Sequence, residues 1–340
     1  MKMAGRINRA IELLDQDQPI YYTGPHSGHV LTYEQGKKDA KTWADYINVG
    51  MEHGSFDMSG LAHYMRGLVD GGPTNSGHRT PAVIVEAPVN GIDASHVRYN
   101  AWQFRQILGR GVHGVLLCQA ESADAVTAFV ESCRYPINKA CVNLSLPTAV
   151  ERLGFGAIDF SGGAKAEPRP TPSPSRGEVS RRADGRPWLG LGTRGRGSED
   201  TAAPIWGTDN TTYVEVADPW PLNRMGELLL GVKIESPEGV ANCDEILAVP
   251  GLGFAEMGPG DLGLSLGYLR GAPRNPYPPE MQASHEIVFA ACRRNGIAFL
   301  EGGTPETIAK LIDTGARVIA GGREDTARAG RAHSKRTMLV

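Results

Sequence analysis

The chain has 340 residues, of which 41% are hydrophobic and 21% charged, and its formal net charge is −3. This length suits one large domain or two modest ones, with enough apolar residues for a sizeable core. The near-balanced charge argues against nucleic acid as a partner. No apolar run approaches the roughly 18 residues that a membrane-spanning helix needs.

The five cysteines are widely spaced and form no C-x-x-C pair. This usage predicts free thiols in a reducing compartment, and therefore a cytoplasmic protein. The N-terminal segment, residues 1–19, carries charges but lacks the apolar stretch of a signal peptide. It predicts a helix on the protein surface.

Short apolar runs alternate with helical segments along the chain, a pattern typical of βα units and a parallel sheet. These runs are apolar on both faces, as strands covered on both sides should be. The predicted strands are residues 19–24, 46–50, 82–87, 114–119, 228–235, 253–257, 297–301 and 317–321.

Helices are predicted at residues 93–108, 123–134, 237–247, 280–295 and 304–313. Ser236 before Pro237, and Thr304 before Pro305, provide an N-cap and a first helical residue. Eight strands with intervening helices predict a single (β/α)8 TIM barrel over residues 1–340. An open doubly wound sheet is the alternative.

One segment interrupts this alternation between the fourth and fifth predicted strands. Residues 161–185 are rich in Pro, Ser, Gly and Arg and poor in apolar side chains. Such a segment buries too little surface to offset the entropy lost on ordering. We therefore expect a long, flexible insertion in the barrel.

Polar side chains follow the predicted strands at their C-terminal ends, where barrel enzymes carry their active sites. Burying acids there is costly unless they are paired or bind metal. Glu235 and Asp261 follow adjacent strands, which lie about 4.8 Å apart, so both could bind one Mg²⁺ or Mn²⁺. Alternatively, Glu235 pairs with an arginine and Asp261 caps a turn. The full set comprises Glu52, His53, Glu86, Gln119, Glu235, Asp261 and Glu301.

Two basic residues could take part in catalysis directly. His53 could act as a general base or simply hydrogen-bond to the backbone, and His26 and His29 are secondary candidates. Lys233 could form a Schiff base with a carbonyl substrate, or pair with a carboxylate inside the barrel. His113 precedes the fourth strand and so lies at the wrong end for catalysis.

Two loops could contact the substrate. Arg194, in the segment GTRGRGS, could bind a carboxylate with two hydrogen bonds or lie on the surface. Gly258 and Gly260, in the segment GPGD, allow a tight turn and close approach of a ligand.

Several of these segments resemble the class II pyruvate aldolases of the HpcH/HpaI type. They are VGMEHG, GVHGVLLCQAES, GTRGRGS, APIWG, VKIESPEGV and GFAEMGPGDLG. The resemblance covers about residues 40–335 apart from the insertion. It implies a (β/α)8 barrel assembled as a homo-oligomer, either a hexamer or a dimer.

The resemblance also implies the chemistry of the site. Glu235 and Asp261 match the residues that hold Mg²⁺, Mn²⁺ or Co²⁺, which acts as a Lewis acid on a chelated 2-oxo acid and stabilises its enolate. His53 matches the histidine associated with the base, and Arg194 matches a substrate-contacting arginine. The amides near Gly258 and Gly260 would contact the substrate carboxylate.

The sequence departs from the family pattern at four positions. Gly50 replaces the aspartate that partners the histidine, and Glu86 replaces the arginine that supports the enolate oxygen. Lys233 replaces a glutamine, and Gln119 stands where some relatives have histidine. Glu86 and Lys233 could form a compensating ion pair across the third and fifth predicted strands.

These observations predict a metal-dependent aldehyde-lyase that acts on a hydroxy-oxo acid or a related carbonyl compound. Glu235 and Asp261 would bind the metal, and His53 and Arg194 would be catalytic. Gly258, Gly260, Glu86, Gln119 and Lys233 would bind the substrate. A Schiff-base lyase using Lys233 and a non-catalytic binding or assembly protein are the alternatives.

Overall fold

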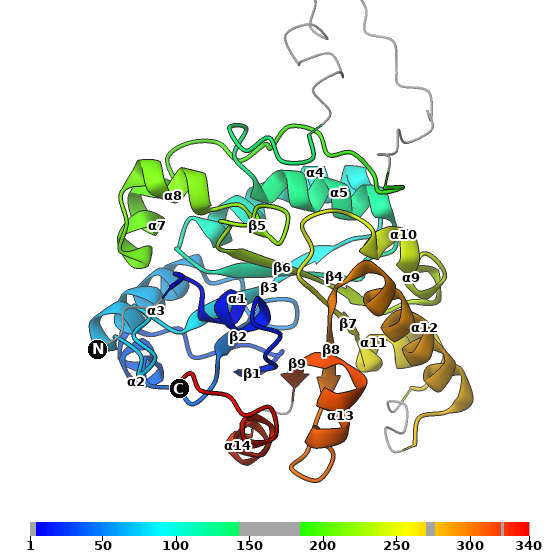
Figure 1. The fold of residues 1–340 in the computed structure, drawn as a ribbon. Helices are drawn as coiled ribbons and strands as arrows, with labels where there is room; N and C mark the ends of the chain where they lie inside the picture. Colours follow the sequence, from blue (N-terminus) through cyan, green and yellow to red (C-terminus); the bar gives the residue numbers. More distant parts are fainter. Residues whose placement is uncertain (1–4, 143–183, 270–275, 321–322, 340) are drawn as a thin grey trace, which may run out of the picture.

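The computed structural model describes residues 5–142, 184–269, 276–320 and 323–339 (Figure 1). Eight parallel strands form a closed barrel, because the fourth of them pairs with the fifth as well as with the third. The predicted (β/α)8 barrel is therefore confirmed, and the open doubly wound sheet is wrong. The barrel strands are β1 (Ile20–Thr23), β2 (Tyr46–Gly50), β3 (Ala82–Asn90), β4 (Gly114–Cys118), β6 (Leu228–Ile234), β7 (Phe254–Met257), β8 (Ala298–Gly302) and β9 (Ala316–Ala320).

A ninth strand, β5 (Pro219–Trp220), pairs with β6 outside this ring. Two residues are too few to show an apolar pattern, so the sequence did not predict it. Each of the other strands was predicted to within three residues at either end. Val, Ile and Leu are the commonest residues of β3, β4 and β6, as expected of strands buried on both faces.

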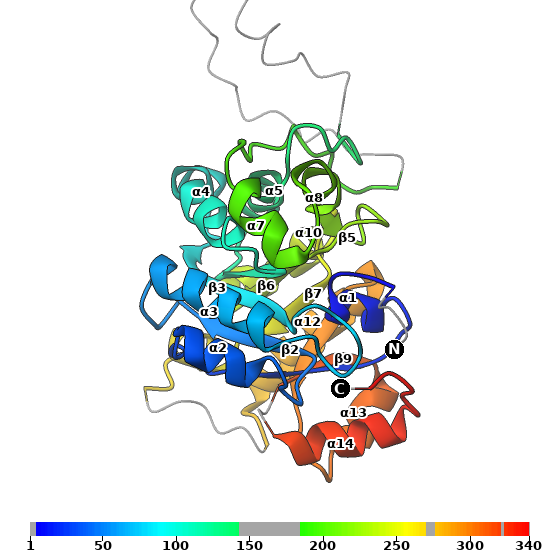
Figure 2. The same ribbon diagram turned by 90° about the vertical axis from the view of Figure 1, so that its left-hand side faces the viewer.

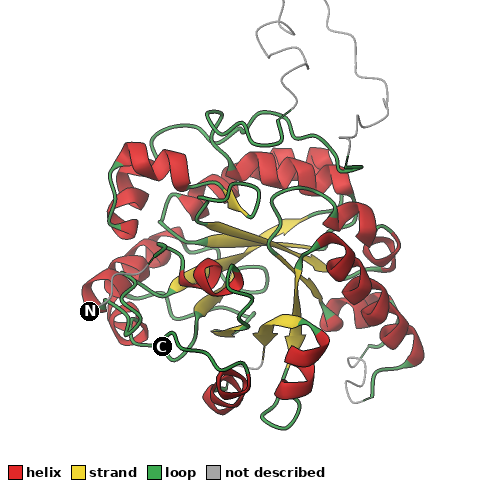
Figure 3. Ribbon diagram, viewed as in Figure 1, coloured by secondary structure: helices red, strands yellow, loops and turns green. Residues whose placement is uncertain are grey.

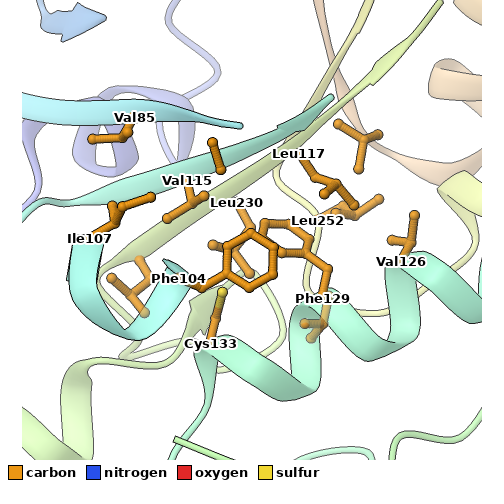
Figure 4. Close-up of a cluster of buried hydrophobic side chains, with 14 of the residues drawn as sticks. Val85, Phe104, Ile107, Val115, Leu117, Val126, Phe129, Cys133, Leu230 and Leu252 are labelled. Carbon is orange, nitrogen blue, oxygen red and sulfur yellow. The ribbon is translucent and has the colours of Figure 1, made fainter. Parts of the chain in front are cut away.

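Helices cover the outside of the barrel (Figure 3). Between them and the strands lies an apolar core in which Phe104 and Phe129 pack against each other and against the strands (Figure 4). The helices are α1 (Arg9–Leu14), α2 (Tyr33–Asp39), α3 (Met58–Gly71), α4 (Ala94–Leu108), α5 (Ala123–Cys133), α7 (Glu199–Trp206), α8 (Asn210–Val216), α9 (Pro237–Ala241), α10 (Cys243–Leu247), α11 (Pro259–Ser265), α12 (Pro279–Asn295), α13 (Ile308–Thr314) and α14 (Glu324–His333).

Helix α1 covers the N-terminal end of the barrel, where Figure 1 shows it in front of the strands. Ala10, Ile11 and Leu13 are fully buried and belong to the same apolar cluster as the inward side chains of the strands. Asn8 caps the helix and also donates a hydrogen bond to the carbonyl oxygen of His113. The predicted helix is therefore confirmed over residues 9–14, but its predicted position on the surface was wrong.

The chain returns to this end of the barrel after α14 (Figure 2). Arg336 donates three hydrogen bonds to Asp45, which is buried and also accepts one from Arg331. The arginines lower the pKa of Asp45 although burial raises it. The C-terminal segment is thus fastened to the loop that precedes β2.

Two helix predictions differ from the structure in their bounds. The segment 237–247 divides into α9 and α10 at Asn242, and α13 begins only at Ile308 because residues 304–307 form a turn. The predicted insertion, 161–185, lies outside the described residues except for its last two positions. Within the described part of the chain, every helix is too short or too polar to cross a membrane.

Candidate active site at the C-terminal end of the barrel

Five acidic side chains gather at the C-terminal end of the barrel, opposite α1. Glu86 lies on β3 beside Gly50 of β2, and Glu256 lies on β7 beside Lys233 of β6. The others follow strand ends: Glu52 after β2, Glu235 after β6 and Asp261 in the first turn of α11. Each therefore owes its place to the common direction of the parallel strands.

Lys233 lies among these acids and is itself buried. Its Nζ atom is 2.6 Å from Glu52 Oε2, 3.6 Å from Glu86 Oε2 and 3.9 Å from Glu235 Oε1. The predicted ion pair with Glu86 is confirmed. Burial lowers the pKa of Lys233, but the surrounding negative groups outweigh it and raise that pKa above its usual value. The ammonium form is thus strongly favoured.

Glu235 is the most strongly perturbed of the acids. Burial raises its pKa to about 8, against the opposing effect of Lys233. Its Oε2 accepts a hydrogen bond from the backbone amide of Gln119, which has a left-handed φ of 46°. A non-glycine residue in that conformation is uncommon, and such strain is found most often at functional sites.

Gly258 lies directly against Glu235, because a Cβ atom at this position would be 2.2 Å from Glu235 Oε1. Its amide donates to the carbonyl oxygen of Ile234 and is not free to bind a substrate carboxylate. This corrects the predicted role of the Gly258 amide. Gly260 faces open space, with no atom within 4 Å of an added Cβ, and its substrate contact stays a prediction.

Two groups of side chains at this end have the spacing of metal ligands. One consists of Glu52, His53 and Asp261, and the other of Glu52, Cys118 and Glu235, with ligand atoms within 4.8 Å of one another in each. Glu52 belongs to both groups, which the sequence did not predict. His53 Nε2 lies 3.6 Å from Glu52 Oε2 and 3.7 Å from Asp261 Oδ2.

This donor set fits a hard divalent cation. Carboxylate oxygens and an imidazole are suitable ligands, whereas burial raises the pKa of the Cys118 thiol and keeps it protonated. Among the described residues, Lys233 is the only lysine or arginine that forms an ion pair with any of the five acids, and it pairs with three of them. The buried Oε2 atoms of Glu86 and Glu256 accept no hydrogen bond from the described residues.

Glu256 was missed by sequence reasoning. It is almost fully buried, and burial raises its pKa to about 7. The available signal was an acid in the middle of the apolar run GFAEM. Since Lys233 is its direct neighbour on β6, both side chains face the interior of the barrel.

His26, a secondary candidate, takes a central position. Its Nδ1 atom lies 2.5 Å from Glu86 Oε1, which also accepts a hydrogen bond from Asn48. The other ring nitrogen, Nε2, lies 3.3 Å from the hydroxyl of Tyr22. The hydrogen bond with Glu86 raises the pKa of His26.

Two other predicted or candidate residues lie apart from the acids. Arg194 is fully buried at the N-terminal end of the barrel, where it donates to Tyr213, whose hydroxyl donates to the last residue of α4. The structure therefore does not bring Arg194 to the mouth of the barrel. His29 lies within hydrogen-bond distance of Asp39 and Tyr64 and contacts none of the five acids among the described residues.

The side chain of Gln119 is half-buried. Its contact with the substrate stays a prediction.

A closed parallel barrel with carboxyl groups around its C-terminal end defines a TIM-barrel protein with an acidic mouth. The chain belongs to the HpcH/HpaI aldolase/citrate lyase family, whose model matches residues 89–326. The resemblance inferred from the sequence motifs is therefore confirmed.

Two curated relatives are 34% identical to parts of this chain. One is a 2-dehydro-3,6-dideoxy-6-sulfogluconate aldolase from Pseudomonas putida, over 85 residues, 25% of this chain and 32% of that protein. The other is a hydroxypyruvate/pyruvate aldolase from Pseudomonas aeruginosa, over 132 residues, 38% of this chain and 45% of that protein. The chain thus matches less than half the length of each.

A solved structure, an HpcH/HpaI aldolase/citrate lyase family protein from Burkholderia cenocepacia J2315, resembles nearly the whole chain. It has a TM-score of 0.61 at 18% identity, covering 96% of this chain and 97% of that chain. At that identity the likeness establishes the fold alone.

Proposed function

We propose that this protein is a divalent-metal-dependent carbon–carbon lyase of the aldolase type, acting on a hydroxy-oxo acid or a related carbonyl compound. The observation that carries the proposal is the excess of carboxyl groups at the mouth: five acids gather there, and three of them lie within 4 Å of the one buried lysine. A cation would offset this charge and allow an anionic oxo acid to bind there.

Glu235 and Asp261 fall in different groups of possible ligands, and Glu52 belongs to both. These three side chains would hold the metal, with His53 beside Glu52 and Asp261. When bound, Mg²⁺, Mn²⁺ or Co²⁺ would supply a Lewis acid for a substrate carbonyl. Lys233 orients Glu52, and the Gln119 amide orients Glu235. The names of the two curated relatives are those of aldolases of oxo acids, which supports a substrate of the same class.

The Schiff-base alternative is disfavoured by the surroundings of Lys233. An amine must lose its proton before it attacks a carbonyl, and three acidic side chains within 4 Å favour the ammonium form. Borohydride reduction in the presence of pyruvate tests this point. A mass increment on Lys233 would restore that alternative.

Manganese binding, followed by electron paramagnetic resonance, tests the metal site. We expect Glu235→Gln and Asp261→Asn to weaken Mn²⁺ binding at least about tenfold. Glu215→Gln, an exposed acid on α8, serves as the matched control and should bind as the wild type does. Equal binding by all three variants would contradict the assignment.

Turnover on a panel of 4-hydroxy-2-oxo acids, with and without chelation, tests the activity. We expect cleavage that is lost on exhaustive chelation and restored by Mg²⁺ or Mn²⁺. Full activity after chelation would remove the metal from the mechanism. An absence of metal binding and of turnover would favour a non-catalytic binding or assembly protein.

A further inference from the structure

The loop after β1 passes unusually close to β2. A Cβ atom at Gly50 would lie 2.0 Å from the carbonyl oxygen of His26, and one at Gly24 would lie 2.1 Å from that of Asn48. Gly24 also has a left-handed φ of 107°. The backbone of His26 therefore occupies the space that any side chain at position 50 would need.

This close approach brings the imidazole of His26 against Glu86. The carboxylate is 1% exposed and is held by Asn48 on one side and Lys233 on the other, whereas the His26 ring is 44% exposed. One ring nitrogen is thus fixed by a buried carboxylate while the ring stays accessible from solvent. The contact of Nε2 with Tyr22, at 3.3 Å, is long for a hydrogen bond and constrains that nitrogen little.

We propose that His26 is a catalytic residue of the lyase reaction, transferring a proton through Nε2, and that Glu86 is its positioning residue. The inference rests on the proposed function. In the cleavage direction, neutral His26 accepts the proton of the substrate hydroxyl. The carbon–carbon bond breaks, the aldehyde carbonyl forms, and the electron pair of the broken bond passes to the oxo-acid enolate.

His26 can then return this proton to the enolate carbon, which gives the free oxo acid. The imidazole therefore ends the cycle neutral. In the direction of carbon–carbon bond formation, the imidazolium gives its proton to the developing alkoxide oxygen. Glu86 stabilises the imidazolium in both directions, as a buried carboxylate does for a histidine held in one orientation.

The same contact explains two departures from the family pattern together. Gly50 provides the space for the His26 backbone, and Glu86 provides the partner of its ring. An aspartate at position 50 would displace the loop, and an arginine at position 86 would repel the imidazolium. A histidine–carboxylate pair formed from the loop after β1 and from β3 thus takes the place of the pair that the family resemblance implies at positions 50 and 53.

The charged groups around His26 agree with a proton carrier. The hydrogen bond from Glu86 raises the pKa of His26 and outweighs burial, which lowers it; Glu256 on β7 raises it further, and Lys233 on β6 lowers it. The phenol of Tyr22 on β1 stays neutral, because burial raises its pKa well above its usual value.

Histidine NMR tests the pair without turnover. In the metal-free full chain, His26 should titrate above the ordinary imidazole pKa, and Glu86→Gln should return it toward about 6.5. Oxalate with Mg²⁺, a non-reactive stand-in for an oxo acid, should shift the His26 ring signals. A His26 signal that is unchanged in Glu86→Gln, or unmoved by Mg²⁺-oxalate, would overturn the inference.

Kinetics test the catalytic role. We expect His26→Asn to lower kcat about 100-fold or more while Mn²⁺ binding stays within about twofold of wild type. His63→Asn, an exposed histidine on α3, is the matched control and should retain full activity. Glu86→Gln should lower kcat by about tenfold and shift the pH profile with the pKa of His26.

Three outcomes would overturn the inference. A His26→Asn enzyme with kcat within about threefold of wild type, beside an inactive Glu235→Gln enzyme, would remove His26 while leaving the lyase assignment intact. Loss of Mn²⁺ binding in His26→Asn would make this residue part of the metal site or of the fold. No turnover by wild type on any substrate would overturn the lyase assignment itself, and His26 with it.

Discussion

A fall in pH should destabilise this protein through His113, which precedes β4. Its ring is 1% exposed, stacks on Trp206 and accepts a hydrogen bond at Nδ1 from the amide of Val83. Burial lowers the pKa of His113 to about 3. The native state therefore holds this imidazole neutral, because its protonation would break the hydrogen bond and place an unpaired charge in the core.

The unfolded chain binds the proton more readily, near the ordinary pKa of about 6.5, so its proton uptake lowers stability as the pH falls. The contribution of His113 is fully present above pH 6.5 and declines below it until the folded pKa is reached. Between about pH 7.5 and about pH 5, the loss is about 2 kcal/mol of unfolding free energy. This figure depends on the unfolded pKa alone, provided that the folded pKa lies below about 4.

Urea unfolding of the wild type and of His113→Asn at the two pH values isolates this contribution. The asparagine oxygen can accept the same bond from Val83 but does not titrate. We expect the variant to be less stable at pH 7.5, because it loses the stacking on Trp206. Its stability should fall by about 2 kcal/mol less than that of the wild type on acidification. Parallel losses in the two proteins, within about 0.5 kcal/mol, would refute the reasoning.

Three further predictions follow from contacts described above. Asp45→Asn should lower the unfolding free energy by about 3 kcal/mol at neutral pH, because Arg336 loses its buried partner. The difference in urea unfolding should shrink toward pH 3, because the folded pKa of Asp45 is lowered and the unfolded wild type takes up the proton first. Gly50→Ala should lower the melting temperature by displacing the loop of His26, whereas Gly302→Ala, with open space at its Cβ, should not; equal melting temperatures would contradict the contact. Light scattering should find a homo-oligomer, with a mass that is a multiple of 36.4 kDa, and a monomer would refute this expectation.

The barrel could be predicted because its strands are short apolar runs in regular order. Helix α1 was predicted as a helix but its burial was not, since its sequence includes Arg9 and a charged flank. The buried Arg9 donates hydrogen bonds to the carbonyl groups of Ala44 and Asp45 and to the hydroxyl of Ser76. Turn 304–307 shows a similar limit: Thr304 and Pro305 have the residue types of a helix start, but the helix begins later.

The candidate site was predicted in part for the same reason. Glu235 and Asp261 follow apolar runs directly, so their common end of the barrel could be inferred. Glu256 lies inside such a run, and His26 reaches the mouth through a loop whose path depends on two glycines. Arg194 belongs to a loop that turns toward the opposite end, and no local pattern gives the direction of a loop.

Helix α1 affects the end of the barrel from which a small molecule can reach the acidic mouth. Because apolar side chains of α1 and of the strands pack into one buried cluster at the N-terminal end of the barrel, we expect a ligand of the acidic mouth to enter from the C-terminal end. Under the proposed lyase reaction, substrate and products would pass through the same opening. Of the two fragments of one cleavage, the outer fragment would then leave before the inner one.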